Sequence, residues 1–128
     1  MRDLEHARAL LDMARKDLAA LCAMGDRQAF ADEILGFHAQ QTAEKALKAW
    51  VAYLGQEYPF RHDLGELLSL LEGLGQDVRR FWDLVDYTDF GVRFRYEAVE
   101  EEEPPLERES TCARLTALVE HVERLLGE

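Results

Sequence analysis

Apolar residues recur every three or four positions along most of this chain, which is the pattern of amphipathic helices. Glycines, prolines or short polar runs separate the apolar stripes, and no strand-like alternation occurs between them. The stripes predict helices at residues 2–24, 27–54, 63–73, 77–87 and 106–126. Five helices with short connections predict an all-α, up-and-down bundle. We expect residues 1–128 to form one domain, the usual size for a single core.

The predicted helix at 27–54 differs from the others because it is apolar on two sides. One side carries Ala39, Ala43, Ala46, Leu47, Trp50 and Leu54. The nearly opposite side carries Phe30, Ile34 and Phe37, followed by Gln41, Glu44 and Lys48. A helix that is apolar on two sides has to be covered on both. We therefore expect a second helix layer or a second subunit here, and predict a homodimer with an interface at Phe30, Ile34, Phe37, Gln41 and Glu44.

Composition narrows the class of protein further. No apolar run approaches the ~20 residues that span a bilayer. The charged start of the chain lacks the apolar block of a signal peptide, so we expect a cytoplasmic protein without membrane contact. Cys22 and Cys112 stand 90 positions apart and the four histidines are scattered, so the sequence predicts two small buried cysteines, no metal site and no cofactor.

The chain is acidic, with a formal net charge of −11. Its overall field repels polyanions, so binding of a nucleic acid or nucleotide requires a local basic patch. Much of the negative charge lies within a short span: Glu97, Glu100, Glu101, Glu102, Glu103, Glu107 and Glu109. This span is interpreted as a solvated segment leading into a helix, with docking of a partner protein as the alternative.

Three places carry basic groups that suit a phosphate. Lys45 and Lys48 lie on the predicted helix 27–54, where Glu44 stands four residues before Lys48 and favours an ion pair. His62 precedes the predicted helix 63–73, where backbone N–H groups favour anions. The third place contains Arg93, Arg95 and Tyr96, whose guanidinium groups and ring suit a phosphate and a stacked base. A purely structural role is the alternative for each place.

Several of these residues also occur in an order that resembles the core signature of HEPN domains. They are Gln40-Gln41, Glu44-Lys45, Leu47-Lys48-Ala49, His62-Asp63-Leu64 and Arg95-Tyr96. The resemblance implies a dimerising helical bundle, often encoded beside a minimal nucleotidyltransferase, with nucleotide binding proposed for its cleft. Other members of the family are metal-independent ribonucleases, including toxins of toxin–antitoxin pairs.

The nuclease branch carries an arginine and a histidine separated by four to six residues. Here only Arg114 and His121 fit, with Leu115 where a polar residue usually follows the arginine. The two lie about 10 Å apart along a helix axis, and we expect both on its solvent-exposed flank. The resemblance therefore favours the nucleotidyltransferase-associated branch.

The leading hypothesis is a non-catalytic HEPN-type protein that binds a nucleotide or phosphate and partners a minimal nucleotidyltransferase. One form of this hypothesis places the two proteins in a toxin–antitoxin pair. Its candidate contacts are Lys45, Lys48, His62, Arg93, Arg95 and Tyr96. One alternative is a ribonuclease that uses Arg114 and His121 in a dimer cleft, since cleavage by the 2′-hydroxyl needs an acid–base group and positive charge beside one phosphate. The other is a pure protein-interaction module. The sequence leaves RNA contact open.

Overall fold

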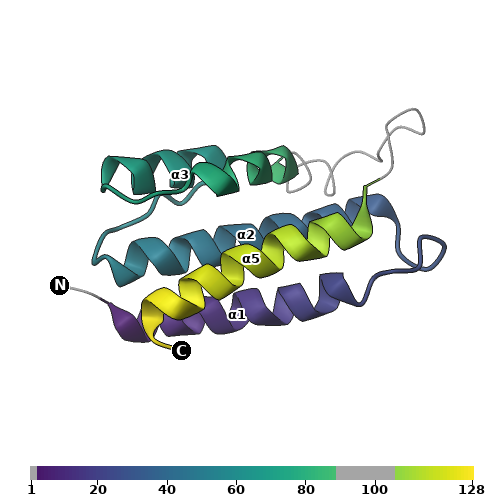
Figure 1. The fold of residues 1–128 in the computed structure, drawn as a ribbon, viewed down its shortest axis with the longest axis horizontal. Helices are drawn as coiled ribbons and strands as arrows, with labels where there is room; N and C mark the ends of the chain where they lie inside the picture. Colours follow the sequence, from purple (N-terminus) through teal and green to yellow (C-terminus); the bar gives the residue numbers. More distant parts are fainter. Residues whose placement is uncertain (1–2, 89–105) are drawn as a thin grey trace.

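A computed structural model describes residues 3–88 and 106–128. Within these ranges the regular elements are all helical, which confirms the predicted all-α bundle. They are α1 (Leu4–Cys22), α2 (Asp32–Tyr53), α3 (Leu64–Gly73), the 3-10 helix η1 (Arg79–Tyr87) and α5 (Arg108–Leu126). Helices α1, α2 and α5 run alongside one another, while α3 and η1 form a layer on one side of them (Figure 1). None of the described helices is apolar over enough turns to cross a membrane.

The predicted helices are found, but some of their boundaries differ. Helix α2 begins at Asp32 rather than at residue 27, because Asp26 organises a turn. The Asp26 side chain accepts a hydrogen bond from the Gln28 N–H, and the Asp26 carbonyl accepts one from the Phe30 N–H. The predicted helix at 77–87 is the tighter 3-10 form and starts two residues later. The start of α3 is as expected, since the Asp63 side chain accepts hydrogen bonds from the N–H groups of Gly65 and Glu66.

Helix α2 lies at the centre of the bundle. It packs against α1, α5, α3 and η1, so the chain itself covers several of its sides. Phe30 and Ile34 are half-buried against the core, Phe37 is half-buried, and Glu44 is buried. Of the two expected alternatives, helices of the chain itself cover this helix, and its apolar pattern does not require a second subunit. Dimerisation itself stays a prediction.

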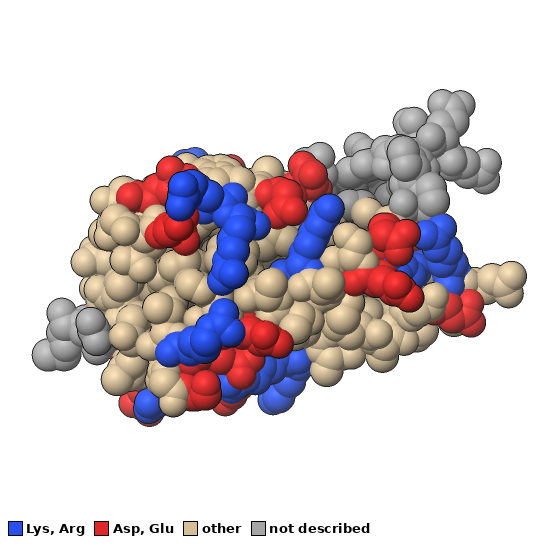
Figure 2. Space-filling view, viewed as in Figure 1, with Lys and Arg blue, Asp and Glu red and all other residues tan. Residues whose placement is uncertain are grey.

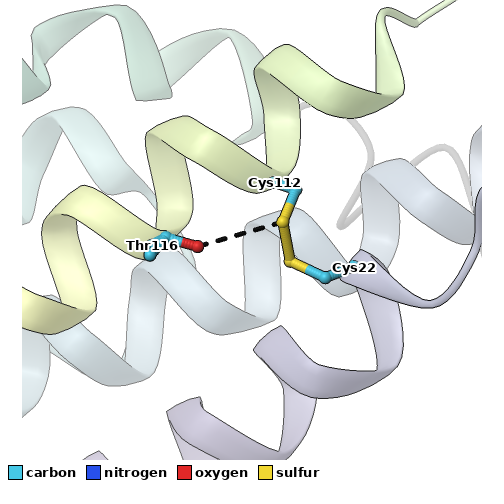
Figure 3. Close-up of a disulfide and its surroundings, with 3 residues drawn as sticks. All are labelled: Cys22, Cys112 and Thr116. Atoms are coloured by element: carbon cyan, nitrogen blue, oxygen red, sulfur yellow. Dashed lines mark hydrogen bonds between the residues drawn. A yellow bond between two sulfur atoms is a disulfide. The ribbon is translucent and has the colours of Figure 1, made fainter.

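The two cysteines form a disulfide, which corrects the expectation of two separate buried residues (Figure 3). Cys22 is the last residue of α1 and is exposed, whereas Cys112 lies in α5 and is half-buried. The Cys112 sulfur also lies 3.9 Å from the Thr116 hydroxyl. A separation of 90 positions in sequence does not predict this pairing, because the disulfide depends on the end of α1 lying beside the beginning of α5.

Polar contacts tie the same corner together. Arg108, at the start of α5, is buried and donates hydrogen bonds to the carbonyl oxygens of Met24 (2.7 Å) and Phe30 (2.6 Å). It also pairs with the Asp32 carboxylate at 2.8 Å. The Leu106 N–H donates to the other Asp32 oxygen at 3.0 Å. The buried guanidinium of Arg108 thus attaches residues 24–32 to the start of α5, and the disulfide attaches the end of α1 to the same helix.

Removal of the disulfide should destabilise the fold without changing it. We expect Cys22→Ser/Cys112→Ser to lower the free energy of unfolding by about 4 kcal/mol, the usual loss for a cross-link that closes a loop of this length. Urea denaturation followed by circular dichroism measures the change. A dithiol reductant should shift the wild-type midpoint and leave that of the double variant in place. Equal midpoints for oxidised and reduced wild type would contradict the prediction.

Candidate functional site

Residues of the family-like signature meet at one buried carboxylate. Glu44 of α2 is 3% exposed, and one of its oxygens lies 2.5 Å from Nδ1 of His62, which precedes α3. The ammonium group of Lys48, one turn further along α2, lies 3.4 Å from the same oxygen. The Gln40 side-chain amide donates to the His62 carbonyl at 3.4 Å and accepts a hydrogen bond from Gln41 at 2.8 Å. Two segments far apart in sequence are thereby joined through polar groups.

This network balances the charge of Glu44. A buried carboxylate destabilises the fold unless a counter-charge and hydrogen bonds accompany it, and His62 and Lys48 supply them. Lys48 also lies over the ring of Tyr58, 5.2 Å from its centroid. The His62 side chain is 57% exposed, so it can still be reached from solvent. The main consequence is structural, because the network attaches the α2–α3 connection to α2.

Of the other predicted phosphate contacts, Lys45 is described and does not join this cluster. Lys45 points to α1 instead, where its ammonium group lies 2.5 Å from the Asp17 carboxylate. Asp17 also lies 3.3 Å from Nδ1 of His38. The remaining candidates, Arg93, Arg95 and Tyr96, lie outside the described residues, as do Glu97 and residues 100–103 of the acidic span. Of the three predicted contacts that the structure describes, Lys48 and His62 come together at Glu44.

Neutralising Glu44 should weaken the fold. Glu44→Gln keeps the size of the side chain but leaves His62 and Lys48 without their carboxylate, and we expect a loss of about 2 kcal/mol in the free energy of unfolding. Glu66→Gln is a matched control, because Glu66 is partly exposed and its ion pair with Arg61 is long, at 4.0 Å. Urea denaturation compares the two variants. A Glu44→Gln protein as stable as the control would contradict the structural role.

A second cluster of basic groups lies where η1 begins beside α5. Asp77, Arg79, Arg80 and His121 line a cleft of about 640 Å³. The His121 ring is half-buried, with its centroid 4.7 Å from that of Trp50 and 5.5 Å from that of Phe81. Arg80 donates a hydrogen bond to Nδ1 of His121 at 2.9 Å. The expectation that His121 is solvent-exposed on the flank of its helix was therefore wrong, because α2 and η1 cover that side of α5.

The charges around His121 are mainly positive. Burial, Arg80 and Arg124 lower the pKa of its imidazole, and Asp77 raises it to a smaller extent. Arg79 is held by Asp77, with two nitrogen–oxygen distances of 2.9 and 3.0 Å. That contact holds the pKa of Asp77 at about 2. Within residues 3–88 and 106–128, neither Arg80 nor Arg124 has a carboxylate at ion-pair distance.

Most other cations of the described chain are compensated. Arg15 contacts Asp12, Glu123 and Glu128, and Arg8 contacts Glu128. Figure 2 shows Lys and Arg side chains beside acidic ones across the face on which α5 lies. The surroundings of His121 differ from these sites, since Arg80 donates to the ring and neither Arg80 nor Arg124 has a described carboxylate partner.

The second residue of the nuclease-like pair, Arg114, is exposed as expected. Its Nε lies 3.4 Å from the Asp83 carboxylate, and it lines a shallow hollow on η1 and α5 to which Arg80 also contributes. The structure thus pairs His121 with Arg80 rather than with Arg114. Sequence reasoning missed Arg79, Arg80 and Arg124. The available signals were the Arg79-Arg80 dipeptide and the three-residue spacing of His121 and Arg124.

A further cavity of about 650 Å³ lies where α1 begins and α2 ends. Its lining includes Asp3, Glu57 and the pair His6–Tyr58, whose Nε2 and hydroxyl oxygen are 2.6 Å apart. The carboxylates of Asp3 and Glu57 make this cavity unfavourable for a phosphate. No group of three metal-binding side chains occurs in the described parts of the chain.

Comparison with known proteins shows the family. The family model described as HEPN domain matches residues 1–128, which is the whole chain. The chain belongs to the HEPN domain family. No curated protein and no solved structure matches it. Membership in the HEPN family agrees with the all-helical bundle and with the signature around Glu44 and His62. It does not decide whether a phosphate would bind beside His62 and Lys48 or beside Arg80 and His121.

Proposed function

We propose that this HEPN protein is a non-catalytic binder of nucleotides that holds a phosphate group in the cleft between η1 and α5. One observation carries the proposal: the guanidinium of Arg80 and the nearby Arg124 act on His121, and neither has a described carboxylate partner. Guanidinium groups bind phosphate through paired charge-assisted hydrogen bonds. A cleft of about 640 Å³ is large enough for the phosphate portion of a nucleotide.

The local charge matters because the whole chain repels anions. With a net charge of −11, binding has to come from a site whose basic groups are not already paired. Lys45 and Lys48 fit this requirement less well than Arg80, since each is paired with a carboxylate. Arg93, Arg95 and Tyr96 are retained as predicted contacts outside the described residues.

The proposal extends to the partners of the protein. The HEPN family and the signature residues support association with a minimal nucleotidyltransferase, as one half of a toxin–antitoxin pair. A homodimer and a cytoplasmic location are further parts of the proposal. The disulfide is unusual for that compartment, because reducing cytoplasm disfavours such bonds outside hyperthermophiles.

Nucleotide binding should depend on Arg80. We expect wild-type protein to release heat when titrated with ATP or GTP, and Arg80→Gln to bind about tenfold more weakly or worse, because a charged donor to the phosphate is lost. Isothermal titration calorimetry measures both affinities.

Arg8→Gln is the matched control for charge. Arg8 is an exposed arginine of α1 paired with Glu128, so its loss changes the net charge equally without touching the cleft. Its affinity should stay near that of wild type. Lack of binding by wild type at millimolar nucleotide, or equal weakening by both substitutions, would contradict the proposal that the nucleotide binds in this cleft.

A second candidate function, an RNA-cleaving nuclease, is favoured by one observation. His121 is an imidazole beside a guanidinium, and an acid–base group next to positive charge is what attack by a 2′-hydroxyl on its phosphate requires. Its Nδ1 can accept a proton once Arg80 turns from the ring to the phosphate. The guanidinium is that of Arg80, while Arg114 is engaged with Asp83.

The two functions differ in what happens to RNA. If the nuclease function holds, purified protein cleaves single-stranded RNA without added metal, and His121→Ala lowers the rate by about a hundredfold, the usual worth of an acid–base group. His6→Ala is the control histidine, since His6 lies in α1 against Tyr58. Intact RNA, or equal cleavage by wild type and His121→Ala, excludes the nuclease.

A further inference from the structure

We infer that an oxyanion entering the η1/α5 cleft draws Arg80 away from His121, and that the imidazole takes up a proton from solvent as the anion binds. The inference rests on the proposed phosphate-binding function and adds a ligand class, doubly charged oxyanions, together with a dependence on pH. No covalent bond is formed or broken, since the only chemical change is protonation of one ring nitrogen.

The contact between Arg80 and His121 sets the starting state. Guanidinium groups have no acceptor, so Arg80 can only donate to Nδ1. Nδ1 must then be unprotonated, and the ring is neutral with its proton on Nε2. Arg80 also lies against the Phe81 ring, with its guanidinium carbon 4.7 Å from the centroid. His121 is thus the polar acceptor of a guanidinium that lacks a described carboxylate.

The surroundings of the ring explain why it stays neutral. Trp50 of α2 and Phe81 of η1 cover it with aromatic carbon. The charged groups that act on it are Arg80 of η1, Arg124 of α5 and Asp77, which precedes η1. Arg79 also lines the cleft, but Asp77 partly compensates its charge. Burial and the two arginines lower the pKa of His121, and only Asp77 opposes them.

A bound oxyanion reverses these conditions. Its charge offsets that of Arg80 and Arg124, and a guanidinium that turns to the anion leaves Nδ1 free to accept a proton. Both changes favour the imidazolium, so the pKa of His121 is higher in the complex than in the free protein. A group whose pKa rises on binding takes up a proton, and the affinity for the ligand then increases as pH falls between the two values. A doubly charged oxyanion gains most, because its larger charge offsets more of the positive charge of Arg80 and Arg124.

Inorganic sulfate is the probe that isolates this effect, because it does not titrate between about pH 5.5 and pH 8, where histidine does. Calorimetry in two buffers of different ionisation enthalpy should show proton uptake on sulfate binding. Affinity should rise as pH falls, by at most about tenfold per pH unit for one proton. An NMR titration of the wild-type His121 ring should show a higher pKa with sulfate than without it.

Substitutions locate the proton. His121→Gln should bind sulfate with no dependence on pH, and thermal unfolding would show whether loss of the ring contacts with Trp50 and Phe81 harms the fold. His38→Gln, which alters a half-buried histidine beside Asp17, should keep the dependence on pH. The NMR titration of wild type decides the matter if His121→Gln does not fold.

The outcomes separate the inference from the function it rests on. Sulfate binding with no proton uptake and an unchanged pKa of His121 overturns the inference and leaves phosphate binding in place. Failure of both sulfate and inorganic phosphate to bind at any of these pH values overturns both.

Discussion

The central position of α2 is the constraint on which the rest of the structure depends. A helix surrounded by α1, α3, η1 and α5 cannot leave polar side chains without partners, because an unpaired buried charge would cost several kcal/mol. Glu44 therefore requires His62 and Lys48, and Lys45 is paired with Asp17. The contact of Glu44 with His62 positions the connection between α2 and α3, and the contact of Lys45 with Asp17 attaches α2 to α1. Both place the residues that look most like a binding motif in a structural role.

The basic residues of this acidic protein fall into two kinds, those paired with a carboxylate and those without such a partner among the described residues. Lys45 and Lys48 of α2 and Arg8 and Arg15 of α1 are matched with carboxylates, and their charge is compensated within the fold. Arg80 and Arg124 lie at the edge, where η1 meets α5, and they act on a histidine instead. The consequence is a small positive site on a chain whose total charge is −11.

The corner formed by the end of α1, residues 24–32 and the start of α5 combines two kinds of attachment. The disulfide joins Cys22 to Cys112, and Arg108 binds two carbonyl groups and Asp32 from the same corner. α5 carries His121 and Arg124, and the ring of His121 packs against Trp50 of α2 and Phe81 of η1. Both attachments therefore help to place α5, and with it the cleft.

Local periodicity determined the secondary structure of this protein, because the spacing of apolar residues and the caps at glycine and at Asp63 act within a few positions. The all-α class, most of the five helices and the HEPN family were readable from the sequence. Only the tertiary structure decided what covers the second side of α2, that Cys22 and Cys112 form a disulfide, and which basic groups have no carboxylate partner among the described residues. These outcomes depend on contacts between distant segments, such as Glu44 with His62 and Arg80 with His121, and a one-dimensional pattern does not contain the distance between them.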